Sequence, residues 1–275
     1  MMSKAVTNPA LRYYGGKFRL GWWIAAQFPP HVSYVEPFGG AAGVLLRKHP
    51  VPVEVYNDLD GMVVNFFRVL REQPQELVRM LKRTPFSRAE FDQSYEPAAD
   101  PLEAARRFFI QAWQGFGGPR LHKITGWKMQ KRIWTDSRAN QMEEWHASIR
   151  NLLRVARRFR SVQIESDDAL KVIRRFDTVD TLFYCDPPYP SDTRNETWCK
   201  VAYTHEFTSH DHVHLANLLK SIDGMAAISS YANPLYSELF ADCEQITKTT
   251  QTMNKTIATE VIYLSPKLSA ARALL

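Results

Sequence analysis

The sequence has few cysteines and no long hydrophobic run. Its 275 residues include three cysteines, Cys185, Cys199 and Cys243. An odd number of widely spaced cysteines predicts neither a disulfide framework nor a thiolate metal site, so we expect reduced thiols. Apolar residues nowhere continue for the roughly 18 positions that a membrane span needs, and the N-terminus lacks the charged and then apolar pattern of a secretory signal. We therefore expect a soluble, intracellular protein without a membrane partner.

Internal repeats and low-complexity linkers are also absent from the sequence. With 45% hydrophobic residues, the chain can bury a substantial core, either as one large domain or as a domain that carries a smaller insert. The net charge of +6 favours a polyanionic partner, although an excess of lysine and arginine also serves solubility.

Short β-rich runs alternate with helical patterns along most of the chain. Residues 33–48 read as a strand, a glycine-rich turn and the helix-forming run VLLRK. Further strands are predicted at 53–58, 162–165, 181–185, 225–230, 244–250 and 260–265. Such alternation is typical of an α/β fold with a doubly wound, mostly parallel sheet, and the last two strands, which follow each other directly, predict an antiparallel edge strand.

The interval 73–159 has a different texture, because it is almost entirely helical. Ser87 with Glu90 fits a capping box, and Asp100 before Pro101 fits the start of a second helix. The sequence therefore predicts a helical insert: residues 1–72 and 160–275 form one domain, and residues 73–159 form a subdomain within it.

Three chemically distinctive positions each follow a predicted strand directly. They are the glycine turn that begins at Gly39, Asp58 and Asp186, and the carboxyl ends of parallel strands meet in one crevice where ligands bind. Asp58 follows Gly39 by 19 positions, a spacing that suits a carboxylate accepting hydrogen bonds from ribose hydroxyls. The pair indicates an adenosine-type ligand, a nicotinamide dinucleotide included. The alternative is a glycine-rich surface turn followed by an acidic helix cap.

The tetrapeptide Asp186-Pro187-Pro188-Tyr189 ends the strand at 181–185. Each proline fixes its own φ and disfavours helical geometry in the residue before it, so the segment is stiff. It presents a carboxylate, a backbone carbonyl and an aromatic ring together. These groups are complementary to a planar molecule with an exocyclic NH2 group, and a nucleobase amine fits that description.

The ordered set of motifs resembles the DNA adenine methylase (Dam-type) family of S-adenosylmethionine-dependent N6-adenine DNA methyltransferases. The matching motifs are LRYYGGK at 11–17, YVEPFGGAAGV at 34–44, VYND at 55–58, FYCDPPYP at 183–190, EFTSHDHVHLANLLK at 206–220 and ISSYANP at 228–234. The order, with a recognition segment between the cofactor motifs and the catalytic motif, is that of this family. Ala42 stands where these enzymes often carry a second glycine.

The resemblance implies a Rossmann-like methyltransferase fold with a target-recognition insert, and it implies a cofactor site for S-adenosyl-L-methionine. Asp58 matches the ribose-binding acid, while Asp186 matches a carboxylate that both contacts the cofactor and takes part in catalysis. The expected cofactor-binding residues are Tyr13, Lys17, Glu36, Pro37, Phe38, Gly39, Gly40, Asp58 and Asp186.

The expected catalytic residues are Asp186, Pro187, Pro188 and Tyr189. Adenine N6 is a poor nucleophile because its lone pair is delocalised into the ring. If Asp186 and the Pro187 carbonyl accept the two N6 hydrogens, the nitrogen is drawn towards tetrahedral geometry and the charge that develops on it is stabilised, while Tyr189 stacks on the base. Direct methyl transfer depends on positioning and needs neither a covalent enzyme intermediate nor a metal.

A paired adenine must leave the duplex to reach such a pocket, and the helical insert is expected to hold the DNA. Its expected DNA-binding residues are Arg120, Lys123, Lys128, Lys131, Arg132 and Arg138, with 114–132 as the candidate recognition loop. The alternative is an exposed loop with solvated charges. The arginines of 150–160 serve either DNA or the wet side of a core helix. His210 and His214 share a helix face, but a helix cap explains this segment better than a metal site.

We therefore predict a site-specific DNA methyltransferase that transfers the methyl group of S-adenosyl-L-methionine to N6 of an adenine flipped out of double-stranded DNA. The alternatives are a cytosine-N4 or an RNA adenine methyltransferase, or a non-catalytic DNA-binding module with this fold. We expect a monomer or weak dimer without metal, located in the cytoplasm of a bacterial or phage-infected cell, near the nucleoid. Its setting is restriction-modification, a phage or chromosomal regulation.

Overall fold

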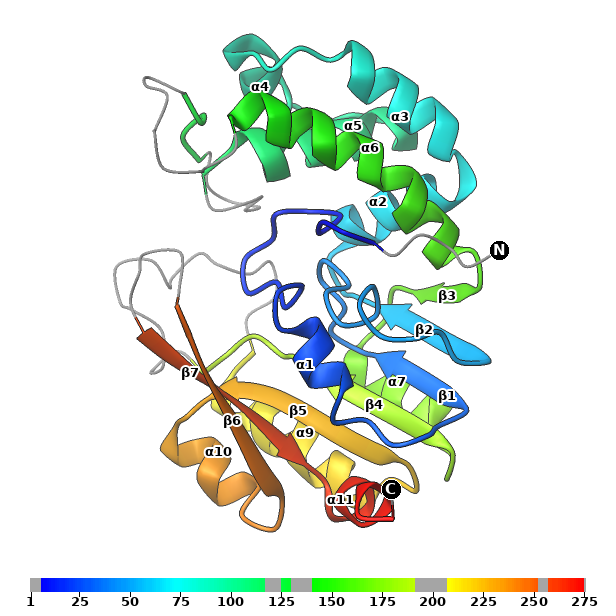
Figure 1. The fold of residues 1–275 in the computed structure, drawn as a ribbon, viewed down its shortest axis with the longest axis vertical. Helices are drawn as coiled ribbons and strands as arrows, with labels where there is room; N and C mark the ends of the chain where they lie inside the picture. The colour runs from blue at the N-terminus through cyan, green and yellow to red at the C-terminus, as the bar shows by residue number, and fades with distance from the viewer. Residues whose placement is uncertain (1–5, 117–124, 130–139, 191–206, 252–256, 275) are drawn as a thin grey trace. The chain divides into compact units, whose positions relative to one another are not determined.

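The computed structural model describes residues 6–116, 125–129, 140–190, 207–251 and 257–274. The chain forms two compact units, whose helices and strands are labelled in Figure 1. The helical unit comprises Met1–Gly21, Gly40–Arg47 and Asp60–Val162. The sheet unit comprises Trp22–Gly39, Lys48–Leu59 and Gln163–Leu275. The division of the chain into a catalytic domain and a recognition subdomain remains a prediction.

A seven-stranded sheet with the order β3-β2-β1-β4-β5-β7-β6 forms the centre of the sheet unit. Its strands are β1 (Ser33–Glu36), β2 (Val53–Asn57), β3 (Val162–Glu165), β4 (Thr181–Cys185), β5 (Met225–Tyr231), β6 (Glu244–Gln251) and β7 (Ile257–Leu264). Parallel pairing joins β2, β1, β4 and β5, whereas β7 runs antiparallel to both β5 and β6. The predicted α/β fold is confirmed. The antiparallel strand lies one position inside the edge, because the β6–β7 pair docks on β5 through β7.

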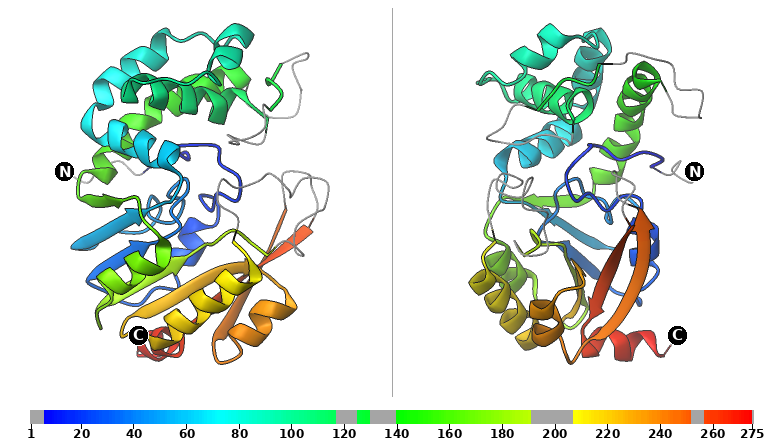
Figure 2. Two further views of the ribbon diagram at one scale, coloured as in Figure 1. Left: turned by 180° about the vertical axis from the view of Figure 1, so that it is seen from behind. Right: turned by 90° about the vertical axis from the view of Figure 1, so that its left-hand side faces the viewer.

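Helices cover the two faces of this sheet. On one face, α7 (Ala169–Phe176), α9 (Ser209–Ser221) and α10 (Pro234–Leu239) pack against Val35, Phe183 and other apolar strand residues. Figure 2 (left) brings α7 and α9 to the front. On the other face lie α1 (Gly21–Ala25) and α11 (Pro266–Arg272), and the ring of Phe28 packs on Tyr34 and Tyr184. Because both faces are covered, every residue of β4 is buried, which explains its continuous apolar sequence.

The helical unit contains α2 (Gly61–Glu72), α3 (Pro74–Arg83), α4 (Arg88–Gln93), α5 (Pro101–Gln114) and α6 (Gln141–Phe159). The predicted helix starts are confirmed, because the Ser87 side chain accepts from the Glu90 amide and Asp100 caps α5 with proline at its first position. Aromatic rings form the core. Phe67 stacks on Phe159 with ring centroids 4.5 Å apart.

The segment after β1 differs from the prediction. Residues 40–47 form turns instead of the expected helix at 44–48. Gly40 and Ala42 both have positive φ, +45° and +55°. Pro50 follows within two residues of the expected helix end, so the apolar run is too short to propagate a regular helix.

Candidate active site

The carboxyl edge of the sheet unit carries the predicted site residues of that unit. The Pro37–Gly39 turn follows β1, Asp58 follows β2 and Asp186 follows β4. Strand β1 pairs with β2 on one side and β4 on the other, so the strand order reverses direction at β1. In doubly wound sheets, ligands bind at this reversal, outside the carboxyl ends of the strands.

Gly39 closes the turn after β1 tightly against β2. Its amide donates to the Asn57 carbonyl at 2.7 Å. A Cβ atom at this position would overlap the Tyr56 ring and lie 2.9 Å from the Asn57 carbonyl oxygen. Only glycine therefore fits here, and the turn keeps its backbone near the strand end. Beyond it, the Phe38 ring packs edge to face on Phe207, with centroids 5.4 Å apart.

Asn57 joins three of the loops at this edge, and the sequence analysis did not single it out. Its amide nitrogen donates to the Pro37 carbonyl at 2.8 Å and to the Asp167 carbonyl at 3.0 Å, and its side-chain oxygen accepts from the Asp167 amide at 3.0 Å. The side chain is fully buried. A polar residue that ends a buried strand directly before Asp58 was the available signal.

Asp167, after β3, is a further acid at this edge, in addition to Asp58 and Asp186, and the prediction omitted it. Arg175 donates to its carboxylate at 2.8 Å, and this hydrogen bond lowers the pKa of Asp167. Its signal in the sequence was an acid two positions after the predicted strand 162–165, close to the pattern that identified Asp58 and Asp186.

Glu36 is buried at the end of β1. It is 2% exposed, and its Oε1 atom accepts from the Tyr34 hydroxyl at 2.6 Å. Burial, and next the charge of Glu36, raises the pKa of Tyr34 well above 10, so this hydroxyl remains a donor. The cofactor contact expected of Glu36 remains a prediction.

The Asp186–Tyr189 segment continues from β4, where Asp186 is half-buried and Pro187 is buried. The Tyr189 side chain is nearly covered, at 9% exposed, and its hydroxyl donates to Glu260. Its ring meets that of Tyr231 edge on, with centroids 4.8 Å apart. Glu260 and Tyr231 therefore both contact the Tyr189 side chain. The roles of these residues remain predictions.

Tyr13 and Lys17 belong to the helical unit, where they pack on the glycine turn. A Cβ atom at Gly43 would lie 2.9 Å from the Lys17 amide nitrogen, and one at Gly40 would lie 3.4 Å from the Tyr13 ring. Lys17 is 7% exposed and its Nζ atom donates to the Gly15 carbonyl at 3.1 Å. The YYGGK motif thus contacts Gly40 and Gly43 within this unit, and its cofactor role remains a prediction.

Most of the predicted DNA-binding residues lie outside the described part of the chain: Arg120, Lys123, Lys131, Arg132 and Arg138. Lys128 is described and is 7% exposed. Its Nζ atom donates to the Trp113 carbonyl at 3.1 Å. Burial, reinforced by the charge of Arg12 and opposed by that of Glu144, lowers the pKa of Lys128 to about 7. This is the environment of an interior lysine, and its expected phosphate contact remains a prediction.

Other predicted features of the insert have structural partners. Arg106 binds Glu90 and Glu103, each at 2.7 Å. Most of the arginine run at 150–160 lies on α6, whose buried face includes Leu152, Val155 and Phe159, so the expected core face is present. Whether the arginines bind DNA remains a prediction. Outside the insert, the expected helix cap at the start of α9 is confirmed, and Thr208 forms a capping box with Asp211 there.

Among the described residues, no group of three or more histidine, cysteine, aspartate or glutamate side chains is arranged to hold a metal ion. None of the described helices combines the length and hydrophobicity of a membrane span.

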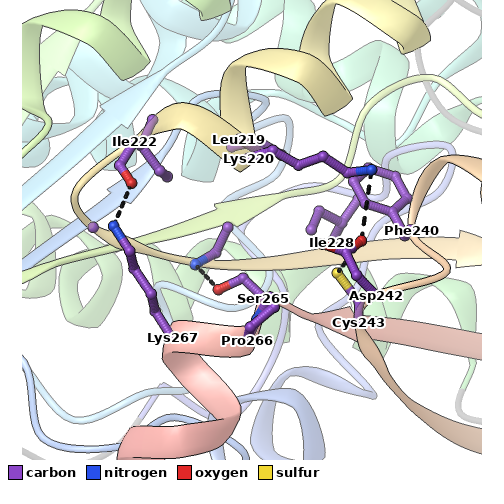
Figure 3. Close-up of a pocket in the computed structure, with 12 residues that line it drawn as sticks. Leu219, Lys220, Ile222, Ile228, Phe240, Asp242, Cys243, Ser265, Pro266 and Lys267 are labelled. Carbon is purple, nitrogen blue, oxygen red and sulfur yellow. Dashed lines mark hydrogen bonds and ion pairs between the residues drawn. The ribbon is translucent and has the colours of Figure 1, made fainter.

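A cavity of about 190 Å³ lies at the amino end of β5, away from the carboxyl edge of the sheet (Figure 3). It is lined by apolar residues such as Ile228 and Phe240, and Lys267 at its rim donates to the Ile222 carbonyl at 2.7 Å. None of the predicted site residues lines it, because they follow the carboxyl ends of the strands and this cavity lies at the amino end of β5.

The doubly wound α/β fold and the residues that follow the carboxyl ends of its strands are typical of enzymes that bind a nucleoside cofactor. Residues 13–113 and 128–256 match the family described as D12 class N6 adenine-specific DNA methyltransferase. The chain therefore belongs to this family, and it is an adenine-specific DNA methyltransferase that uses S-adenosylmethionine. The predicted family, activity and cofactor are confirmed.

Individual relatives agree with this assignment. The chain is 25% identical over 267 residues to the type II methyltransferase M1.LlaDCHI of Lactococcus lactis subsp. cremoris, and the match covers 87% of each chain. It is 22% identical over 227 residues to the DNA adenine methylase of Escherichia coli K12, covering 77% of this chain and 75% of that protein.

The residues at the carboxyl edge fit the adenosine part of this cofactor. Asp58 is half-buried directly after β2, the position from which a carboxylate binds ribose hydroxyls in folds of this type. The close-packed Gly39 turn presents backbone at the neighbouring strand end. These two features are what a nucleoside requires of such an edge.

Proposed function

We propose that this methyltransferase acts on an adenine flipped out of double-stranded DNA and that Asp186, Pro187 and Tyr189 hold the base. The observation that carries the proposal is the position of Asp186, which follows β4 directly beside the Pro37–Gly39 turn after β1. The cofactor edge and the acceptor segment therefore belong to neighbouring parallel strands.

Asp186 and the Pro187 carbonyl accept the two hydrogens of adenine N6. This pairing localises the nitrogen lone pair and aligns it for transfer, and the negative carboxylate stabilises the positive charge that develops on N6. The prolines hold the two acceptors in a fixed relation, and Tyr189 limits movement of the base. S-adenosylmethionine, when bound, supplies the electrophilic methyl group.

Asp186 does not need to remove a proton before transfer. An ordinary aspartate has a pKa of about 4 and is a weak base, whereas the methylated N6 is cationic and loses its proton readily afterwards. The carboxylate therefore acts mainly as an oriented acceptor, and a proton can pass to it or to solvent once the new bond has formed.

We assign DNA recognition to residues 73–159 and methyl transfer to residues 1–72 and 160–275. Basic residues of the insert neutralise phosphates, and those that reach base edges select the target sequence. On this proposal the enzyme works as a monomer or weak dimer among bacterial or phage DNA in the cytoplasm. M1.LlaDCHI, described as a type II methyltransferase, favours a restriction-modification setting.

The test is methyl transfer by Asp186→Ala. We expect kcat to fall by about 10²–10³-fold or more, with DNA binding retained, because one preorganised electrostatic partner of the transition state is removed. Asp180→Ala is the matched control, since Asp180 is exposed at the opposite end of β4. Labelled methyl transfer should be followed by nucleoside analysis for N6-methyladenine, with duplex DNA, single-stranded DNA and structured RNA as substrates. A normal rate in Asp186→Ala contradicts the proposal, as does a preference for RNA.

A further inference from the structure

A buried carboxylate on β7 binds the tyrosine of the Asp186–Tyr189 segment. The hydroxyl of Tyr189 donates to Oε1 of Glu260. The donor and acceptor are 71 positions apart in the sequence, and both are buried, at 9% and 3% exposed. Burial of a carboxylate without polar partners is strongly unfavourable, so a glutamate here requires polar contacts.

The position of Glu260 in the sheet explains how it reaches Tyr189. Glu260 lies directly opposite Tyr231 in the antiparallel pairing of β5 and β7. Residues opposite each other in such a pair project from the same face of the sheet. The Tyr231 ring meets the Tyr189 ring at 78°. Two neighbouring strands therefore supply one contact to the hydroxyl of Tyr189 and one to its ring.

The Tyr189 hydroxyl is a donor throughout the range in which an enzyme works. Burial raises the pKa of Tyr189 well above 10, and the charges of Asp186 and Glu260 raise it further. A protonated phenol beside a carboxylate makes a charge-assisted hydrogen bond, which is stronger and more directional than a neutral one. Such a bond restricts rotation of the ring about its attachment to the chain.

We propose that Glu260 is a positioning residue for methyl transfer, because it fixes the ring of Tyr189 next to Asp186 and thereby fixes where the target base lies. This inference rests on the role given to Tyr189 above. Glu260 itself need not contact substrate or cofactor. The proposal depends on the hydrogen bond to the Tyr189 hydroxyl, and this bond can be tested from both of its ends.

The experiment measures single-turnover methyl transfer, at saturating duplex DNA and cofactor, in four variants: Tyr189→Phe, Glu260→Met, Glu260→Gln and the Tyr189→Phe/Glu260→Met double variant. We expect kcat to fall at least about tenfold in Tyr189→Phe and in Glu260→Met, because small misplacements of reacting atoms are costly. The double variant should be no slower than either single variant. Glu260→Gln keeps an acceptor oxygen and should restore most of the rate.

Two controls separate positioning from folding. Tyr236→Phe deletes another buried hydroxyl, which lies 2.9 Å from His212, and should leave kcat unchanged. Cofactor affinity, measured by calorimetry with S-adenosylhomocysteine, should be unchanged in all Glu260 and Tyr189 variants. If Glu260→Met does not fold, Tyr189→Phe still tests the same bond from its other end.

Three results overturn the inference: a normal rate in Tyr189→Phe, losses that multiply in the double variant, or a Glu260→Gln enzyme as slow as Glu260→Met. Failure of the proposed function looks different, because it requires a normal rate in Asp186→Ala. An inactive Asp186→Ala beside a fully active Tyr189→Phe rejects the role of Glu260 alone.

Discussion

Replacing Lys128 with methionine tests whether the insert of this methyltransferase contains a lysine that is neutral in the folded state. The Nζ atom donates to the Trp113 carbonyl at 3.1 Å, next to the ion pair of Arg12 with Glu144. The pKa of Lys128 is about 7, below the ordinary 10.5, mainly because burial penalises the charged form. Methionine retains the apolar stem and removes the amine.

The direction in which stability changes with pH follows from the number of protons that the folded and unfolded chains bind. Between pH 7 and 10.5 the unfolded chain holds a proton on Lys128 that the folded chain has lost, so the stability of the wild type rises with pH through this window. The stabilisation is complete above pH 10.5 and is lost as pH falls towards 7. Below pH 7 both states are protonated and the dependence ends.

One proton changes the unfolding free energy by about 1.4 kcal/mol per pH unit, so across this window the stability of the wild type can rise by at most about 5 kcal/mol. Relaxation of the surroundings and entry of water reduce the burial penalty on the charged lysine, and we expect a penalty of about 2 kcal/mol. At pH 6, Lys128→Met should therefore be more stable than the wild type by about 1 kcal/mol, because about 2 kcal/mol of burial penalty is removed and about 1 kcal/mol is lost with the hydrogen bond to Trp113. At pH 10 it should be less stable by about 1 kcal/mol, because it lacks the hydrogen bond to Trp113.

The assay is urea unfolding of both proteins at intervals from pH 6 to 10, followed by tryptophan fluorescence. Lys82→Met is the matched control, because Lys82 is exposed in the last turn of α3 and has no burial penalty to lose. A difference between wild type and Lys128→Met that stays constant from pH 6 to 10 refutes the reasoning.

Two further predictions concern the loops at the strand ends. Asn57→Ala should cost about 2–4 kcal/mol of unfolding free energy, because it removes three hydrogen bonds to the backbone of Pro37 and Asp167 and leaves the buried Pro37 carbonyl without that partner. S-adenosylhomocysteine should also bind more weakly in calorimetry. Unchanged values of both would contradict this role. Ala42→Val should cost more than about 2 kcal/mol of unfolding free energy in urea, because a β-branched side chain is poorly accommodated at a buried residue with φ of +55°. The control Ala42→Gly should stay within about 1 kcal/mol of the wild type. Equal losses in the two variants would rule out backbone strain as the cause.

The features predicted correctly from the sequence depend on short-range chemistry. The apolar run at 181–185 bounded β4, and Asp100-Pro101 fixed the start of α5, because buried strands and helix caps are each written in a few consecutive residues. The three strand-end positions were placed on one edge by topology alone. The fold and the identity of the site segments were therefore accessible before any coordinates.

The features that escaped prediction depend on contacts between distant residues. Nothing near Glu260 in the sequence indicates that it binds Tyr189, and the link between Asn57 and Asp167 spans 110 positions. Lys128 follows glycines and other cations, a pattern typical of solvated loops, and only packing around Trp113 makes it an interior residue. The helix expected after Gly43 was lost because the backbone at Gly40 and Ala42 takes another course.

The interleaving of the two units limits how new sequence specificity can be engineered. The helical unit takes in Met1–Gly21 and Gly40–Arg47 as well as Asp60–Val162. The Trp113 indole donates to the Ala10 carbonyl and Arg158 donates to the Leu45 carbonyl, so the long segment is bonded to both short ones. A graft that exchanges only 60–162 with a homologue breaks these bonds. Chimeras should therefore carry all three segments from a single parent.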